Sequence, residues 1–376
     1  MKMKKKMLVT LLLTAAMVCT TLAGCSTPTQ ETANTGTETK DKTEKSSTDT
    51  KTRESATSVE TDKLPAAGIG AQITSDVKAN EEYKIGYIAK NTTNPYMVAQ
   101  AEGIKKAGKD MGFEAVTQAP STADSVEEQV KIMEDMIQKE MDVIIVHCAD
   151  SNGIMPGVRK AEEAGIIVIT IGTPASEDTF LRTGVDYKET GGTIATKMAE
   201  ALNGKGNIII LEGPPGAANA IERLDGIKEA FAEYPDIEVV ASQTANFKRT
   251  EGMSVTENLL QKYTDVQGII GMNDESALGA VQALKAAGKT DVLVAGFDGS
   301  TDATSAVESG DMFATYNTDP YGSGYIACAY AVRNLNDKTE PEGKFIPFPS
   351  AANDPLIMAD TVENYKENIA WWKVIQ

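Results

Sequence analysis

Residues 268–280, which read GIIGMNDESALGA, decide the fold of this chain. The apolar run at the start predicts a buried β-strand, and the apolar spacing from Ala277 onward predicts a helix after a polar turn. In an open parallel sheet, such a turn lies at the carboxyl ends of the strands, where α/β folds bind ligands. Residues 292–300 repeat the arrangement with a strand that ends in Asp298. Either Asn273 and Asp298 contact a ligand, or they only cap a helix and form a turn.

Apolar strands and amphipathic helices alternate around this stretch, from Tyr83 almost to the carboxyl terminus. Strands that are apolar throughout are covered on both faces, which indicates parallel sheets with helices on either side. The alternation stops and restarts after about residue 185, so we expect an α/β protein of two doubly wound, Rossmann-like lobes. A cleft between such lobes is a common ligand site and can close by hinge motion. The predicted strands are 85–89, 114–118, 142–146, 166–171, 207–211, 237–242 and the two described above.

Length and charge narrow the range of functions. The chain of 376 residues is long enough for two domains that each bury a core. Its formal net charge is -18, and removal of a 24-residue leader with four lysines and no acid would take this to -22. Such a chain repels nucleic acids and anionic membrane surfaces at long range. We therefore expect no nucleic-acid partner and, from charge alone, a neutral or cationic ligand.

The amino terminus predicts export and anchoring. A basic segment, Met1 to Lys6, precedes an apolar segment that ends in Leu22-Ala23-Gly24-Cys25. This pattern resembles the lipobox of bacterial lipoproteins, which implies a signal peptide over residues 1–24 and a lipid on Cys25. Residues 25–80 are rich in Thr, Glu and Lys, and we expect a disordered tether there. The predicted location is the outer face of the bacterial cytoplasmic membrane.

Cysteine and histidine do not indicate a catalytic or metal site. Beyond the anchor, the chain holds Cys148, Cys328 and a single histidine, His147. No second cluster of ligands and no nucleophile or phosphate-binding motif accompanies them, so ordinary packing is the favoured reading. We therefore expect no enzyme activity, no cofactor and no metal. A disulfide between the two cysteines remains open at this stage.

Several motifs together resemble ribose-type sugar-binding proteins, the type I substrate-binding proteins of bacterial ABC importers. The resemblance runs from about Tyr83 nearly to the carboxyl terminus and includes the lipobox, the tether and the two series of βα units. It implies a sugar bound between the lobes, three chain segments that form a hinge, and transfer of the ligand to a permease. The motifs that carry it are TNPYM (93–97), IERLDG (221–226), GMNDESALGA (271–280) and AGFDG (295–299).

The resemblance implies a set of ligand-binding residues. Arg223 would donate to ring and hydroxyl oxygens, while Asp298 and Asn273 would accept from hydroxyls. Tyr96 and Phe247 would pack on the apolar faces of a sugar ring, unless they belong to the core. The main residues are Asn94 and Tyr96 in the first lobe and Arg223, Phe247, Asn273 and Asp298 in the second, with Lys90, Thr173, Asp186 and Thr318 as further candidates.

The sequence also departs from the ribose-binding pattern. Ribose binders hold the sugar with an Asp-Arg pair after the fourth strand, where this chain has Gly172 and Thr173. Met97 replaces an aromatic residue, Lys90 a small hydroxyl residue and Thr318 a glutamine. These changes weaken the case for ribose itself, because a buried site rejects ligands that leave its polar groups unpaired. Lys90 would suit an acidic or phosphorylated ligand, or it is salt-bridged or faces solvent.

The family pattern also implies domain boundaries. The chain would cross between the lobes near residues 185–186, 317–318 and 350–351. The amino-terminal lobe would then comprise 82–185 plus 319–349, and the carboxyl-terminal lobe 186–318 plus 350–376.

We therefore predict a monomeric, extracytoplasmic lipoprotein that captures a monosaccharide or polyol and delivers it to an ABC permease. A sensing module that signals to a receptor kinase would have the same site and stays open as an alternative. A non-sugar ligand, such as a furanosyl signal molecule or a nucleoside, also stays open. A transcriptional repressor of this fold is disfavoured by the export signal, the acidic charge and the lack of a helix-turn-helix before the first lobe.

Overall fold

The computed structural model describes residues 77–347 and 355–374. The predicted signal peptide, the lipid anchor Cys25 and nearly all of the predicted tether lie outside these ranges. The last tether residues do not follow the prediction, because they are bonded to the first lobe. The Ala79 N–H donates to the Met111 carbonyl at 2.7 Å, and the Asn80 N–H donates to Asn336 Oδ1 at 3.1 Å. The chain therefore joins the folded lobe a few residues earlier than expected.

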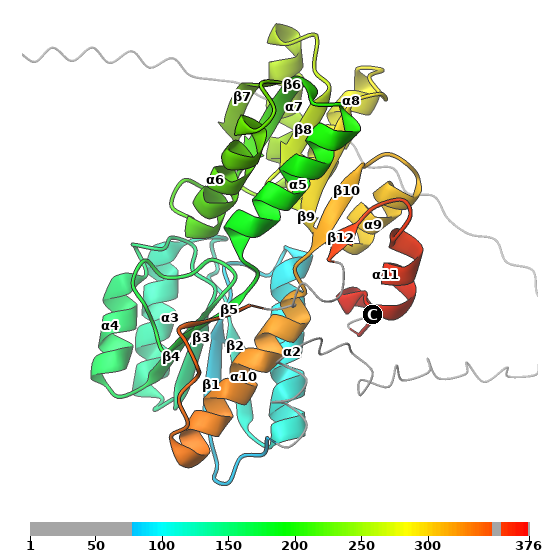
Figure 1. Cartoon of the computed structure of the whole chain (residues 1–376). Coiled ribbons are helices and arrows are strands. Elements are labelled where there is room, and N and C mark those ends of the chain that lie inside the picture. The colour runs from blue at the N-terminus through cyan, green and yellow to red at the C-terminus, as the bar shows by residue number, and fades with distance from the viewer. Residues whose placement is uncertain (1–76, 348–354, 375–376) are drawn as a thin grey trace, which may run out of the picture. The chain divides into compact units, whose positions relative to one another are not determined.

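The first lobe is built on a six-stranded sheet in the order β11-β5-β4-β3-β1-β2, in which all neighbouring strands are parallel. Figure 1 shows its helices packed along the sheet, with the late helix α10 beside α2. The strands are β1 (Lys84–Ile88), β2 (Glu114–Gln118), β3 (Val143–Val146), β4 (Ile167–Ile171), β5 (Leu181–Gly184) and β11 (Phe345–Pro347), and the helices are α2 (Pro95–Met111), α3 (Val126–Gln138), α4 (Met155–Glu163) and α10 (Pro320–Asp337).

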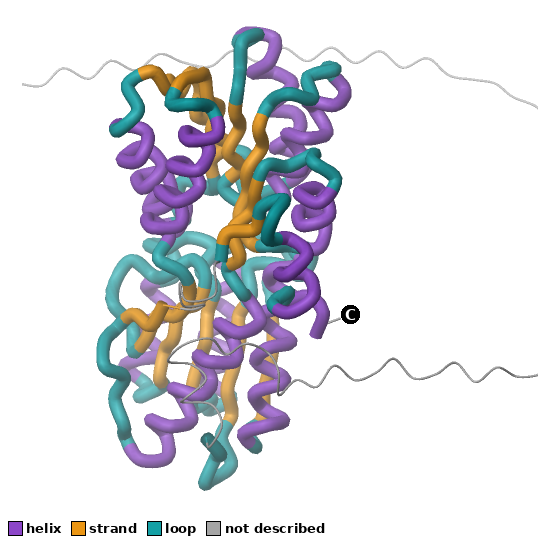
Figure 2. The backbone as a smooth tube through the Cα atoms, turned by 45° about the vertical axis from the view of Figure 1, so that its right-hand side comes forward, coloured by secondary structure: helices purple, strands orange, loops and turns teal. Residues whose placement is uncertain are grey.

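The second lobe repeats this order along its own sheet, β12-β10-β9-β8-β6-β7, with only the β10–β12 pair antiparallel. In both lobes the sheet lies between helices (Figure 2). The strands are β6 (Lys205–Glu212), β7 (Asp236–Thr244), β8 (Gly268–Gly271), β9 (Leu293–Asp298), β10 (Ala314–Asn317) and β12 (Leu356–Ile357), and the helices are α5 (Tyr187–Ala201), α6 (Ala218–Ala232), α7 (Arg249–Lys262), α8 (Asp274–Ala286), α9 (Thr301–Glu308), α11 (Val362–Asn368) and the 3-10 helix η3 (Trp371–Val374).

Each sheet separates two apolar cores, as strands that are apolar throughout require. Along β3, Val143 and Ile145 face one core of the first lobe, and Ile144 and Val146 face the other. Strand β6 divides its side chains in the same way between the two cores of the second lobe. Complete burial of one such aliphatic side chain contributes about 1.5–3 kcal/mol. The predicted two-lobed α/β fold with mainly parallel sheets is confirmed.

The chain passes between the lobes at three places. Strand β5 belongs to the first sheet, whereas the next helix, α5, packs on α6 of the second lobe. After β10 of the second sheet, α10 packs on α2 of the first lobe. The third passage joins β11 to β12 through residues 348–354, which lie outside the described ranges. The residue-level domain boundaries inferred from the sequence stay a prediction.

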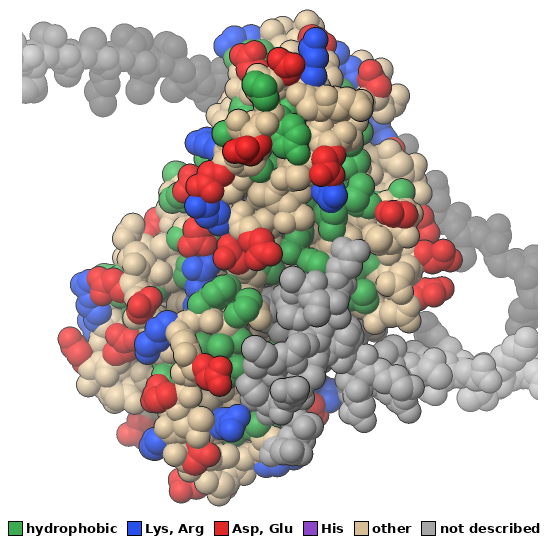
Figure 3. Space-filling view, viewed as in Figure 1, with side chains coloured by type: hydrophobic (Ala, Val, Ile, Leu, Met, Phe, Trp, Pro, Cys, Tyr) green, Lys and Arg blue, Asp and Glu red, His purple; other side chains and the backbone are tan. Residues whose placement is uncertain are grey.

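Within residues 77–347 and 355–374, no helix is both long and apolar enough to cross a bilayer. Asp and Glu side chains are scattered over the face seen in Figure 3, with Lys and Arg interspersed among them.

Candidate ligand-binding site

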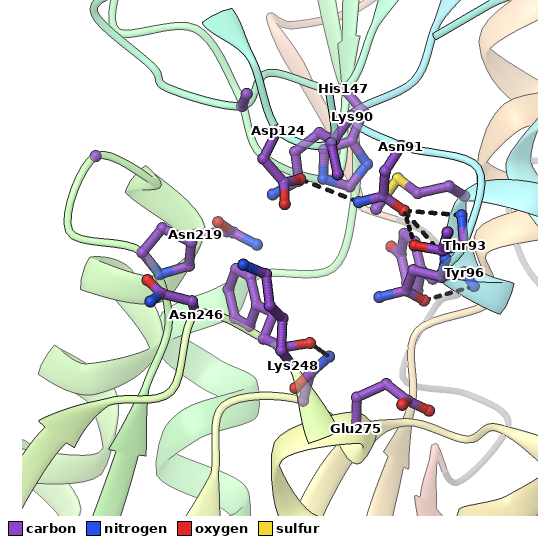
Figure 4. Close-up of a pocket in the computed structure, with 18 of the residues that line it drawn as sticks. Lys90, Asn91, Thr93, Tyr96, Asp124, His147, Asn219, Asn246, Lys248 and Glu275 are labelled. Atoms are coloured by element: carbon purple, nitrogen blue, oxygen red, sulfur yellow. Dashed lines mark hydrogen bonds between the residues drawn. The ribbon is translucent and has the colours of Figure 1, made fainter. Parts of the chain in front are cut away.

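A cavity of about 620 Å³ opens between the two lobes at the carboxyl ends of their strands. This volume lies in the ordinary range for small-molecule sites. Figure 4 shows Lys90, Asn91, Asp124 and His147 on one side of it and Asn219, Asn246, Lys248 and Glu275 on the other. All six main residues inferred from the family resemblance line the cavity, together with Lys90: Asn94, Tyr96, Arg223, Phe247, Asn273 and Asp298.

Arg223 is the buried cation of the second lobe's cavity wall. It projects from α6, is 2% exposed, and donates through Nη1 to the Met272 carbonyl. Its guanidinium lies over the rings of Phe297 and Tyr187, with 4.0 and 5.0 Å to the ring centroids. The Nε–H has no partner among the described residues. A buried, unpaired donor beside a cavity is suited to a ligand oxygen.

Asp298 supplies the buried carboxyl opposite this cation. It ends β9 with φ 121°, a backbone conformation that is strained for a residue other than glycine. Burial and the nearby Asp274 raise the pKa of the Asp298 carboxyl well above its usual range, whereas Arg223 lowers it. The position and the strain fit the acceptor of ligand hydroxyl groups that the sequence predicts.

The structure changes the acceptor role that the family resemblance implies for Asn273. Its side chain caps α8, because Oδ1 accepts from the Ser276 N–H at 2.9 Å and from the Ser276 hydroxyl at 2.7 Å. One Nδ2 hydrogen bonds to the Phe247 carbonyl at 3.1 Å. With both oxygen lone pairs occupied, the amide can offer a ligand one N–H donor, and not the acceptor inferred from the family. The capping reading and the cavity-lining reading are therefore both correct for this residue.

The first lobe contributes Asn94 and Tyr96 from the start of α2. Asn94 Oδ1 caps the helix by accepting from the Tyr96 N–H at 2.9 Å, which leaves its NH₂ group for the cavity. Tyr96 is 9% exposed and meets the His147 ring edge-on, with centroids 5.8 Å apart. It thus belongs to both the core and the cavity wall.

Lys90 and Phe247 face each other across the cavity. The Lys90 ammonium lies 5.1 Å from the centroid of the Phe247 ring and donates to Thr173 Oγ1 at 3.3 Å. Phe247 has φ 59°, so its backbone also lies in the left-handed region. The exposed and salt-bridged alternatives for Lys90 do not hold, since the residue is 4% exposed and forms no ion pair with a described carboxylate.

His147 lies beside Gly172, one of the two positions where the sequence departs from the ribose-binding pattern. Gly172 has φ 67°, and a Cβ there would lie 2.1 Å from Cε1 of His147. The imidazole therefore occupies the space into which a side chain at position 172 would project. Its nitrogens contact Gln100 Oε1 at 2.9 Å and Thr173 Oγ1 at 3.2 Å, and burial holds the pKa of His147 well below its usual value.

Three of the further candidates lie beside the cavity or away from it. Thr173 is fully buried behind the cavity wall and bonds across the lobes to Asn219 Oδ1 at 2.9 Å. Thr318 is buried near Tyr96 and Asp298, with a hydroxyl that forms no well-aligned hydrogen bond. Asp186 is exposed, caps α5 through the Glu189 N–H at 3.0 Å, and does not line this cavity.

The family pattern missed several polar residues of the cavity wall. Asn219 lies one helical turn before Arg223, so helical spacing could have found it. Asn91, Asp124 and Asn246 follow strands β1, β2 and β7, where the strand-end rule applies.

The described residues contain no metal centre or disulfide. No group of three or more His, Cys, Asp or Glu side chains in this part of the chain is arranged to hold a metal ion. Cys148 and Cys328 are both free and buried, and burial raises the pKa of the Cys148 thiol to about 12. A thiol of this kind is an inert packing group, not a nucleophile.

Fold and cavity together define a two-lobed binding protein. Residues 85–339 match the family model of the periplasmic binding protein domain, and the chain belongs to this family. It is 33% identical over 259 residues to a ribose import binding protein of Bacillus subtilis, covering 69% of this chain and 83% of the relative. It is also 33% identical over 284 residues to a xylitol-binding protein of Mycolicibacterium smegmatis, covering 74% and 79% of the two chains.

A solved structure shows the same similarity. An ABC transporter periplasmic solute-binding protein from Actinobacillus succinogenes, solved with bound D-allose, has a TM-score of 0.70 and 33% identity. The match covers 76% of this chain and all of that one.

Proposed function

We propose that this protein captures a monosaccharide or a related polyol between its lobes and delivers it to an ABC permease. The observation that carries the proposal is the set of polar side chains that line the cavity: Arg223, Asp298 and Asn273, all buried, with the buried Tyr96 and the half-buried Asn94 from the opposite lobe. Relatives named for ribose and xylitol, and a similar structure with bound D-allose, support this ligand class. The same residues offer no catalytic nucleophile, so we propose binding without chemical conversion.

Contacts between the lobes beside the cavity support capture by hinge closure. The Ser151 N–H donates to the Gly216 carbonyl at 2.9 Å, and the Ala218 N–H donates to Ser151 Oγ at 3.1 Å. Arg182 of the first lobe forms two hydrogen bonds to Glu222 of the second, at 2.7 and 3.1 Å. These contacts close the lobes around the cavity, and separating them would let a ligand enter.

We further propose that the protein works outside the cytoplasmic membrane as a monomer held by a lipid on Cys25. The lobe boundaries near residues 185–186, 317–318 and 350–351 belong to the same proposal. Replacement of Cys25 by alanine would release the protein into the soluble fraction of cells if the anchor is correct. Retention of the C25A variant in the membrane fraction would contradict the anchor but leave the binding function intact.

The binding function is tested with a ligand panel. The protein is unfolded and refolded to remove carried-over ligand, and its thermal unfolding is followed with monosaccharides, polyols, sugar acids, nucleosides and amino acids. A ligand at a hundred times its Kd adds about 2.7 kcal/mol, or several degrees in Tm. We expect a response within the sugars and their derivatives. A response only to nucleosides or amino acids, or none at all, would contradict the proposal.

A further inference from the structure

Lys90 is a buried cation with unused hydrogen-bond donors. It follows β1 at the cavity wall and is 4% exposed. An ammonium group has three N–H donors. Among the described residues, only Thr173 Oγ1 accepts from it, at 3.3 Å, while Phe247 presents a ring face. The ammonium group therefore has N–H donors left for a ligand in the cavity that Lys90 lines.

The other basic residues of the cavity wall are matched by protein groups. Arg249 pairs with Glu275 at 2.7 Å and with Asp302 at 2.7 Å. Lys248 pairs with Glu251 at 3.0 Å. Arg223 donates to the Met272 carbonyl, and the nearby Asp298 favours its charged form against the effect of burial. Lys90 and Arg223 thus form no ion pair with a described carboxylate, whereas Lys248 and Arg249 do.

The acidic residues on the same wall are already engaged. Asp124 accepts from Asn91 Nδ2 at 3.0 Å, and Asp150 accepts from the N–H groups of Asn152 and Gly153 at 2.9 and 2.7 Å. Burial lowers the pKa of the Lys90 ammonium, and Asp124 opposes this only in part. A buried charge without a partner is unfavourable, so a ligand anion at this point would offset an existing desolvation cost.

We propose that Lys90 binds the carboxylate of an acidic sugar, a uronate or an aldonate, and so selects it over the neutral parent sugar. This inference rests on the proposed sugar-binding function and specifies the ligand class of that site. Asn219, which shares the Thr173 hydroxyl with Lys90, leaves its NH₂ group as a second donor for the carboxylate. Arg223, Asn273 and Asp298 then bind the hydroxyl groups at the other end of the sugar.

A single negative charge fits this wall better than a phosphate. Asp124 and Asp150 line the same cavity as Lys90 and would repel a dianion more strongly than a monoanion. The acidic net charge of the chain does not oppose the inference. It acts at long range and is screened by salt, whereas Lys90 acts at contact distance inside the cavity.

The test measures Kd by calorimetry for matched ligands on the refolded full chain and on its Lys90→Met variant. The ligands are galacturonate and glucuronate, gluconate and galactonate, the neutral parent sugars, and the corresponding sugar 6-phosphates. We expect at least one carboxylate ligand to bind the unchanged protein about tenfold or more tighter than its neutral parent. The K90M substitution should remove that preference and change the Kd of the neutral parent by less than about threefold.

Two further variants separate charge from folding. Lys90→Arg keeps the positive charge and should retain a preference for the carboxylate, whereas Lys188→Met removes a cation that is paired with Glu229 outside this cavity and should change neither Kd. Ligand-free K90M should unfold at the same temperature as the unchanged protein or a higher one, since a poorly compensated charge is removed. A markedly lower unfolding temperature would show that Lys90 is structural and would overturn the inference.

The outcomes distinguish the two proposals. Equal or tighter binding of the neutral parents, a preference for the phosphates, or an unchanged carboxylate preference in K90M would overturn the role of Lys90 and leave sugar binding intact. Absence of binding to every sugar, acid and phosphate would overturn the proposed function and this inference with it.

Discussion

The two walls of the cavity have the same architecture but different chemistry. The sheets share one strand order, so β3 and β4 of the first lobe correspond to β8 and β9 of the second. In the second pair, Asn273 follows β8 with an amide, and Asp298 ends β9 with a carboxyl. The first pair is followed by His147, a buried neutral side chain of the cavity wall, and by Thr173, which is buried behind that wall.

We propose that this difference divides ligand recognition between the lobes. The second lobe presents Arg223, Asn273 and Asp298 to the cavity. In the first lobe, the His147 ring fills the space beside Gly172, and Lys90 of the neighbouring strand end supplies a cation. Under the proposed function, the second wall would bind hydroxyl groups in general, and the first would distinguish between ligands.

The largest effect should come from the second wall. Replacement of Arg223 by methionine keeps much of the packing on Phe297 but removes the donors and leaves Asp298 without its cation. Because hydrogen bonds to charged groups contribute about 1.5–3 kcal/mol, we expect a loss of affinity of about a hundredfold. Calorimetry with the ligand found in the panel measures this change for both neutral and acidic sugars.

The comparison of walls predicts that R223M weakens both ligand types alike, whereas K90M weakens only the acidic ones. A selective effect of R223M on acidic sugars would show that the two walls do not divide recognition in this way.

A second prediction concerns pH and the buried carboxyls of Asp274 and Asp298 in the second lobe. Burial raises the pKa of Asp274 from 3.8 to about 7, so the folded protein keeps a proton that the unfolded chain releases in this window. The free energy of unfolding of the ligand-free protein should therefore fall as pH rises from about 4 to 7, by a few kcal/mol. Because the buried neutral His147 contributes with the opposite sign over the same window, Tm is compared at each pH between the unchanged protein and variants of the carboxyl site.

Two variants sharpen this test. Asp298→Asn removes a second carboxyl whose pKa is raised by burial, so it should flatten the decrease. Thr315→Val removes the hydrogen bond of 2.6 Å that stabilises the charged Asp274 carboxylate, so the decrease should extend to higher pH. A wild-type Tm that rises from pH 4 to 7, with D298N following the same curve, would contradict the assignment.

The smallest effect should come from the contact that joins the walls outside the cavity. Arg182 and Glu222 form a bidentate pair across the lobes, with side chains 24% and 36% exposed. Partly exposed ion pairs contribute about 0.5–1 kcal/mol to the state in which they form. Glu222→Gln should therefore destabilise the closed arrangement of the lobes and, for that reason alone, weaken ligand binding by about two- to fivefold. The pair of Lys188 and Glu229 at 2.7 Å is the matched control, because it joins α5 to α6 within one lobe.

Glu229→Gln should leave the Kd unchanged, as opening of the lobes does not break that pair. Equal losses of affinity in both variants would mean that Arg182 and Glu222 do not act through lobe closure.

Much of the fold could be predicted because its cause is local. Apolar runs such as Ile144 to Val146 and Ile208 to Leu211 define buried parallel strands, and the helices between them show their own spacing. Strand ends also pointed to Asn273 and Asp298. The predicted tether was too long by a few residues, since the hydrogen bonds of Ala79 and Asn80 reach residues distant in sequence.

The sequence by itself determined the two α/β lobes, the family, and the residue types at the strand ends. Only the tertiary structure decided what those side chains do. It showed that both lone pairs of Asn273 Oδ1 are occupied, that Asp186 lies outside the cavity, and that His147 excludes a side chain at position 172. It also showed that Lys90 is buried without a carboxylate partner among the described residues. Periodicity reports which face of an element is buried, whereas hydrogen-bond satisfaction and charge pairing depend on groups that only folding brings together.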